Sequence, residues 1–164
     1  MLRYSAWTHV LLTVYLWIVA CVPLGNWNHQ RDPQLIPAVL SGSGIAVSDL
    51  LMMVFVTIPA VLFWATYQQR RFWIGVVALG FDVFWLWMQL QSWWIPYLLG
   101  TNTRWQLDYA KGPTTKVLPS FGRHVAPDGM HSVIGIMLLA ALITGLMALR
   151  QLKRANEAAA KASC

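Results

Sequence analysis

A carboxylate lies in the middle of a long apolar segment. Residues 81 to 100 read FDVFWLWMQLQSWWIPYLLG, in which one aspartate, two glutamines and four tryptophans interrupt an otherwise apolar run. At a helical rise of about 1.5 Å per residue, Asp82 lies about 15 Å from Phe72, close to the midplane of a ~30 Å hydrocarbon core. A charged side chain costs at least about 2.5 kcal/mol at that depth. We therefore expect Asp82 to face the interior of a helix bundle.

Polar and aromatic side chains around Asp82 recur at helical spacing, so they share one face of a helix. An aromatic wall with an acid at its floor is typical of a cavity for a small hydrophobic or amphipathic, lipid-like molecule. The candidate ligand-binding residues are Asp82, Trp85, Gln89, Trp93, Tyr97 and Asp49. The alternative is that Asp82 and Gln89 make interhelical hydrogen bonds, while the tryptophans fill space and anchor the helix at the interface.

Two further ionisable residues, His9 and Asp49, lie inside apolar segments. Helical rise places His9 about 8 Å and Asp49 about 6 Å from opposite edges of the hydrocarbon core. With Asp82 between them, they would outline a proton path if their helices faced one another. The alternative is that each residue reaches water from a position near a helix end.

A second group of titratable residues lies in LPSFGRHVAPDGMH, from Leu118 to His131. Asp128 and His131 are three positions apart, share a helix face and are, with Asp82, the candidate catalytic acid–base residues. The alternative is a helix start, because Pro127 suits a first turn and Asp128 suits the positive end of a helix dipole. His124 completes an H-x3-D-x2-H pattern, which is not a specific metal signature, so no metal is expected and His124, Asp128 and His131 are its weak candidates.

Other motifs that would indicate a reaction do not occur. The sequence contains no glycine-rich phosphate loop, no H-E-x-x-H and no G-x-S-x-G. Its two cysteines, Cys21 and Cys164, do not form the C-x-x-C pair that thiol oxidoreductases require. No cofactor is expected.

Composition predicts the elements that hold these residues. Hydrophobic residues make up 57% of the 164 positions and charged residues 11%. Four apolar runs are each long enough for a membrane-spanning helix; they cover residues 4–24, 45–67, 72–97 and 130–149. We expect an all-α, integral membrane four-helix bundle forming a single domain over residues 1–164, with outer loops 25–44 and 98–129. Trp105, Tyr109 and Phe121 predict that the second loop packs as an extracytoplasmic cap over the helix ends.

The positive charges predict the orientation. The formal net charge is +6, and seven cations fall in three short segments that must share one side of the membrane. By the positive-inside rule, both termini, the QQRR turn and the 150–164 tail are cytoplasmic in a multi-pass protein of the inner membrane. Because topology accounts for the charge, no nucleic-acid partner is expected.

These features favour a protein that binds or transports a small hydrophobic or amphipathic molecule. A membrane-embedded enzyme acting on a lipid or isoprenoid, and a non-catalytic accessory subunit, are the alternatives. The expected partners are membrane lipid, such a ligand and a second copy of the chain. The second copy would contact small residues of the fourth helix, Ala141, Gly145 and Ala148.

Overall fold

The computed structural model describes residues 1–22, 24–27, 47–104, 106–107 and 114–162. Its elements in chain order are α1 (Leu2–Cys21), the 3-10 turn η1 (Gly25–Trp27), α3 (Val47–Gln69), α4 (Phe72–Gln89), the π-helical turn η2 (Leu90–Trp94), α5 (Ile95–Leu99) and α7 (Gly129–Ala162). Two isolated β-bridges join Lys116 to Asp128 and Phe121 to His124. All other regular elements in the described part of the chain are helices, which confirms the predicted all-α class.

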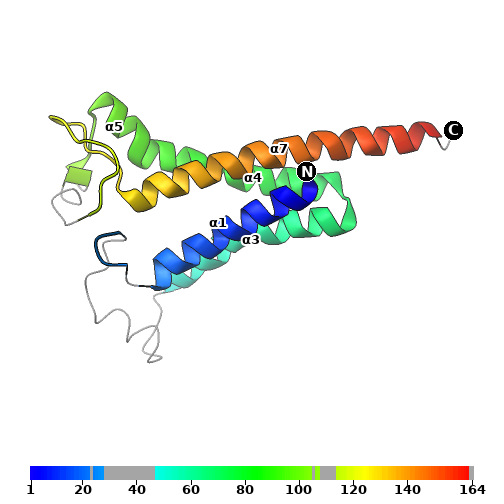
Figure 1. Ribbon diagram of the computed structural model, residues 1–164, viewed down its shortest axis with the longest axis horizontal. Coiled ribbons are helices and arrows are strands. Elements are labelled where there is room, and N and C mark those ends of the chain that lie inside the picture. The colour runs from blue at the N-terminus through cyan, green and yellow to red at the C-terminus, as the bar shows by residue number, and fades with distance from the viewer. Residues whose placement is uncertain (23, 28–46, 105, 108–113, 163–164) are drawn as a thin grey trace.

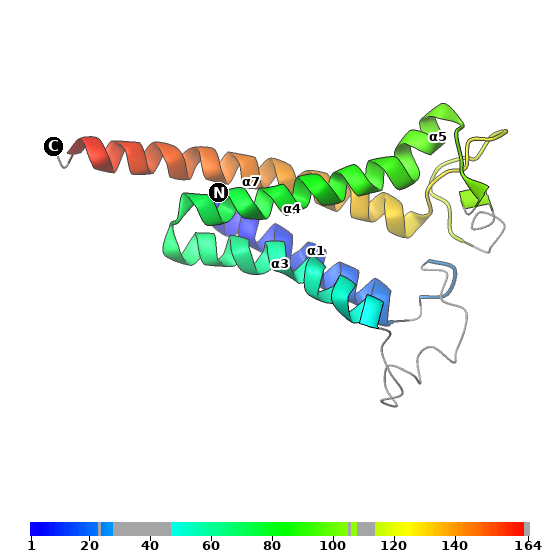
Figure 2. The same cartoon turned by 180° about the vertical axis from the view of Figure 1, so that it is seen from behind.

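The four long helices form a ring (Figures 1 and 2). Helix α1 packs against α3 and α7, and α4 packs against the same two helices. Helices α1 and α4 are therefore diagonally opposite across the bundle. Helix α4 continues through η2 into α5, since Gln89, Leu90, Trp94 and Ile95 at the junctions all have α-type backbone angles.

Small residues of α7 allow the helices of the ring to approach closely. A Cβ added at Gly145 would lie 2.7 Å from Leu79 and 2.8 Å from Phe63. Ala141 and Ala148, on the same face, are fully buried. The predicted association face of the fourth helix is therefore inside the monomer, because glycine and alanine there make room for side chains of α3 and α4. A second copy of the chain would have to use another surface.

The outer faces of all four helices are apolar. Large exposed side chains include Trp7 on α1, Trp64 on α3, Trp73 on α4 and Ile136 on α7, and Trp73 is 74% exposed. Two helices, Phe72–Leu99 and Gly129–Ala162, are long and apolar enough to cross a membrane. Helices α1 and α3, of 20 and 23 residues, pack alongside them.

The cationic segments gather at one end of the bundle. The N-terminus, the turn between α3 and α4 and the C-terminal extension of α7 all lie at the same end in Figure 1. Arg70, in that turn, has a φ of 56°, which lets the chain reverse direction between the two helices. The described residues 24–27, 100–104, 106–107 and 114–128 lie at the opposite end.

The loop after α5 attaches to the helix ends, but not as the sequence predicted. The Tyr97 hydroxyl donates to the carbonyl of Pro119 at 3.1 Å, and His124 Nδ1 donates to the carbonyl of Tyr97 at 2.7 Å. Phe121 was expected to be substantially buried, and this is wrong, because its side chain is 56% exposed. Its ring instead meets Tyr97 edge-on and stacks on His124, with ring centres 6.0 and 4.9 Å away. Trp105 and Tyr109 lie outside the described residues.

Candidate functional site

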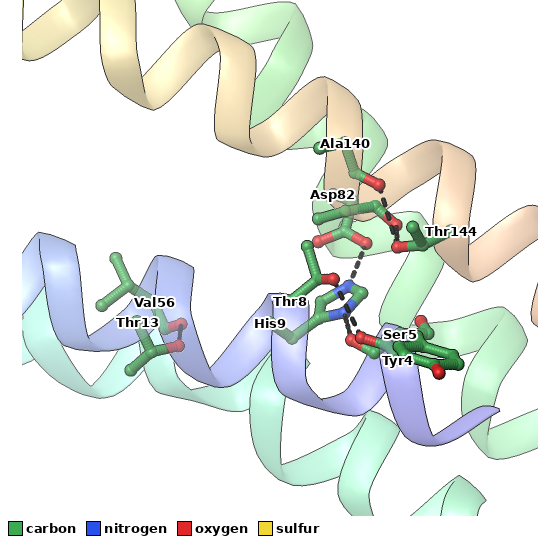
Figure 3. Close-up of polar contacts among 10 residues, drawn as sticks. Tyr4, Ser5, Thr8, His9, Thr13, Val56, Asp82, Ala140 and Thr144 are labelled. Carbon is green, nitrogen blue, oxygen red and sulfur yellow. Dashed lines mark hydrogen bonds and ion pairs between the residues drawn. The ribbon is translucent and has the colours of Figure 1, made fainter. Parts of the chain in front are cut away.

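His9 and Asp82 meet at the centre of the bundle (Figure 3). Nε2 of His9 lies 2.8 Å from Oδ2 of Asp82, and each side chain is 1% exposed. Because α1 and α4 are diagonal, this contact crosses the interior of the ring. Asp82 thus faces the bundle, as its depth in the apolar segment predicted, and His9 does not reach water.

The His9 ring is held on its other two sides as well. Nδ1 of His9 donates to the carbonyl oxygen of Ser5, one turn earlier in α1, at 2.7 Å. Phe63 of α3 stacks on the imidazole with ring centres 4.0 Å apart and planes 25° apart. The far edge of Phe63 packs against Gly145 of α7. One layer of side chains thereby joins all four helices, and it fixes the orientation of the histidine.

A small cavity adjoins the pair. It is lined by His9, Leu12, Thr13, Leu16, Val56, Pro59, Asp82, Trp85 and Leu138. The space open to the centre of a water-sized sphere is ≈ 10 Å³, which is room for about one water molecule. Of the residues predicted to line a ligand cavity, Asp82 and Trp85 line this small space, and Gln89 and Trp93 do not. This closed space is too small for a lipid-like molecule.

The π-helical turn separates the predicted stripe into two parts. Helical spacing from Asp82 to Trp93 assumes an unbroken α-helix, but Leu90–Trp94 is wound with a wider turn, which rotates the faces that follow it. Trp93 is buried and packs on His131, with ring centres 4.0 Å apart. Gln89, before the turn, has a buried Oε1 without a hydrogen-bond partner among the described residues. Trp93 and Tyr97 therefore belong to the loop end of the bundle and not to the surroundings of Asp82.

Asp128 and His131 form a second buried contact, at the start of α7. Oδ1 of Asp128 accepts hydrogen bonds from the backbone N–H of His131 and from its ring Nδ1, both at 2.8 Å. Asp128 thus caps the helix N-terminus, where its negative charge is favourable. The helix-start interpretation of the sequence is confirmed for Asp128, whereas Pro127 lies before the first helical residue, Gly129; the Asp128 and His131 side chains do share a face. Trp27 packs beside them against Gly129, and its indole N–H donates to the Tyr15 hydroxyl at 3.1 Å.

The weak metal candidates do not come together. His124 directs Nδ1 to the carbonyl of Tyr97, whereas His131 directs Nδ1 to Asp128. Within the described residues, no three His, Cys, Asp or Glu side chains are grouped so that they could hold a metal ion. Asp49 lies in the first turn of α3, but its side chain is outside the described part of the structure. The predicted proton path would run through Asp49, Asp82 and His9. Among the described side chains, the structure shows one part of it, the contact between His9 and Asp82.

An apolar groove, which the sequence did not predict, runs along the outside of α1 and α3. It is lined by Thr13, Val14, Trp17, Ile18, Val22 and Thr57 and encloses ≈ 460 Å³. The indole N–H of Trp17 donates to Thr57 at 3.1 Å, so the wall is tied across the two helices. Thr13 lines both this groove and the cavity beside His9. In the sequence, the only indication of this groove is the presence of Thr13, Trp17 and Thr57 within apolar runs. The pairing of α1 with α3 is what brings these residues together.

A second open groove, of ≈ 430 Å³, lies between α3 and α4 and is lined by Phe55, Val77, Gly80, Phe81 and Phe84. Unlike the first, it shares no residue with the cavity beside the buried pair. Of these two grooves, the α1–α3 groove is the one that shares a lining residue, Thr13, with that cavity. Comparisons with protein-family models, with curated proteins and with solved structures give no match.

Proposed function

We propose that this chain is a four-span protein of the cytoplasmic membrane that binds a lipid-like molecule, with the hydrocarbon part of the ligand in the α1–α3 groove. The single observation that carries the proposal is the position of Thr13. Its side chain lines the groove on one side and the cavity of the His9–Asp82 pair on the other. A ligand in the groove would lie one side chain away from a buried proton donor and acceptor.

The apolar exterior supports four spans. Exposed side chains such as Leu11 on α1 and Val61 on α3 are as apolar as those of the two helices long enough to cross a membrane. Left in water, such surface costs about 25 cal/mol per Å², and monomeric soluble proteins rarely expose large apolar patches. Helices α1 and α3, with 20 and 23 residues, are about 30 Å long or more, which matches the hydrocarbon core. Placing all four helices in lipid removes this cost.

The charge distribution supports cytoplasmic termini. Arg3, Arg70, Arg71 and Arg150 lie in segments that gather at one end of the bundle. The extension of α7 adds Lys153, Arg154 and Lys161 at that end. Cations in short segments are retained on the cytoplasmic side during insertion. The loop end would then face outward.

The groove has the size and chemistry of a site for a hydrocarbon chain. Its volume of ≈ 460 Å³ falls in the range of about 300–1,000 Å³ that is usual for small-molecule sites. Val14, Trp17, Ile18 and Val22 expose apolar surface along its mouth, which would open toward the lipid. The tie between Trp17 and Thr57 holds the two walls at a fixed separation, which lowers the entropy lost on binding.

The enzyme alternative uses the same location. A carboxylate and an imidazole 2.8 Å apart can move a proton, and the adjoining groove would supply a substrate of the lipid or isoprenoid class. The accessory-subunit alternative has less support, because Ala141, Gly145 and Ala148, the face it would have used, are buried in the monomer.

A groove-filling substitution tests the proposal. Val14→Trp places an indole in the groove, and we expect at least about ten-fold lower occupancy of the co-purifying ligand, equivalent to about 1.4 kcal/mol. The measurement is native mass spectrometry of protein released from lipid nanodiscs. Val83→Trp is the matched control, because Val83 is also exposed, at 54%, but lines neither groove. Retention of the ligand by the Val14 variant, or equal loss from both variants, would remove the groove as the site.

The same spectra separate binding from catalysis. Asp82→Asn keeps the size and hydrogen-bonding capacity of the side chain but removes the carboxylate. If the chain only binds its ligand, the molecule carried by this variant has the same mass as that carried by the unmodified protein. A ligand of different mass in the Asp82→Asn variant would be unconverted substrate, and would favour the enzyme alternative.

A further inference from the structure

The hydrogen bonds of His9 fix how many protons the central pair holds. A carbonyl oxygen can only accept, so the 2.7 Å contact with Ser5 requires a proton on Nδ1 of His9. Nε2 then has two options in its 2.8 Å contact with Asp82. It donates its own proton to a carboxylate, or it accepts the proton of a carboxyl group. Both arrangements place one proton between Nε2 and Oδ2.

We propose that His9 and Asp82 together form a buried binding site for a single proton, and that the pair is uncharged as a whole while the proton is bound. When the proton is on the ring, an imidazolium faces a carboxylate. When it is on the acid, a neutral imidazole faces a carboxyl group. The transfer between these forms moves the proton between two atoms and leaves the net charge of the bundle centre at zero. This inference goes beyond ligand binding and does not depend on it.

The surroundings favour one bound proton over none or two. The cavity wall beside the pair contributes Leu12 and Leu16 from α1, Val56 and Pro59 from α3, Trp85 from α4 and Leu138 from α7. Among the described residues lining this cavity, His9 and Asp82 are the only titratable ones. Loss of the proton would leave an unpaired negative charge, and gain of a second would leave a positive one. Either charge would be buried without a partner, which is costly in an apolar interior.

The rigid placement of His9 makes the site specific. Stacking on Phe63 and the bond to Ser5 prevent the ring from turning to offer Nδ1 to Asp82 in place of Nε2. A histidine free to rotate could exchange tautomers and would not define the proton count. In the other histidine–aspartate contact the ring is oriented differently: Nδ1 of His131, and not Nε2, faces Asp128.

Solid-state NMR of protein carrying ¹⁵N-labelled histidine, in lipid bilayers, tests the proposal. The signals of His9 are assigned by their absence from the His9→Gln variant. In the unmodified protein we expect a protonated Nδ1 and an Nε2 that shares a hydrogen-bonded proton with an oxygen. The protonation of Nδ1 and Nε2 is measured on the unmodified protein, so this result does not depend on a variant retaining its fold. A His9 ring with an unprotonated Nδ1 would overturn the proposal.

Two Asp→Asn variants supply the matched comparison. In Asp82→Asn no carboxylate remains to balance an imidazolium, so with Nδ1 donating to Ser5 we expect Nε2 to be unprotonated and to accept from the side-chain amide. Asp128→Asn makes the same change at the other buried aspartate, and asparagine caps helices as well as aspartate does. We expect it to leave the His9 signals in place and to shift those of His131. A His9 Nε2 that stays protonated in Asp82→Asn would overturn the shared proton, because the ring would then hold that proton without the carboxylate.

Discussion

At the centre of the bundle, a histidine and an aspartate depend on each other energetically. Each is fully buried and each satisfies the other's hydrogen-bonding group, so neither is tolerable alone in an apolar interior. Asp128 also contacts a histidine ring, but its burial is stabilised differently, because its carboxylate also caps a helix through a backbone N–H. Burial of both aspartates therefore reflects local partners and not a general tolerance for charge.

Replacing one member of the central pair should cost more than replacing both. We expect His9→Leu or Asp82→Leu to lower the free energy of unfolding by about 3–5 kcal/mol each, since a buried polar group loses its partner. The double variant should lose much less than the sum of the two. Reversible unfolding in mixed micelles, analysed as a double-mutant cycle, measures the coupling between the positions. Additive losses would mean that the contact contributes nothing of its own.

At the level of the helices, small residues decide how closely α7 approaches its neighbours. Side chains of Phe63 and Leu79 pack against Gly145, where a larger residue would carry its Cβ. Those of Leu149 and Thr66 pack in the same way against Gly75. The Phe63 that fills the space at Gly145 is the residue that stacks on His9. Helix packing and the orientation of the buried pair are thus coupled through one aromatic ring.

Two glycine substitutions separate packing from helix propensity. Gly145→Ala should destabilise the protein by about 1–3 kcal/mol, because its Cβ would overlap Leu79 and Phe63. Gly80→Ala should be neutral or stabilising by up to about 1 kcal/mol, because an added Cβ there meets nothing within 4 Å. Thermal unfolding of both variants in the same detergent makes the comparison. Equal effects at the two positions would contradict close packing of α7 at Gly145.

For the whole molecule, the arrangement of termini and loops at opposite ends makes the proposed topology open to a direct test. The start of α1, the turn at Arg70 and the extension of α7 share one end, and residues 114–128 lie at the other. In the proposed four-span topology, the first end would be cytoplasmic and the second would face outward.

Cysteine labelling in intact cells checks this orientation. In a background carrying Cys21→Ser and Cys164→Ser, we expect Lys161→Cys to resist a membrane-impermeant maleimide until the cells are opened. Val117→Cys, at an exposed position of the loop end, should react at once. The reverse pattern would invert the topology, and immediate reaction at both positions would contradict the four-span arrangement.

Periodicity and composition by themselves determined the helical elements and the inward direction of Asp82. Apolar runs long enough for helices coincide with α1, α3, α4 and α7 to within a few residues at the starts, and the PDGMH pattern marked the cap of α7. These are local properties, set by hydrogen bonds and side-chain polarity within a few turns.

Tertiary structure alone decided which residues meet. His9 and Asp82 are 73 positions apart, and only the diagonal placement of α1 and α4 brings them into contact. The π-helical turn at Leu90–Trp94 interrupts the α-helical spacing that would align Trp93 with Asp82, and the ring arrangement turned the small-residue face of α7 inward. Helical spacing specifies faces but not their neighbours, because the rotation and pairing of helices depend on how side chains of several helices fill one shared interior.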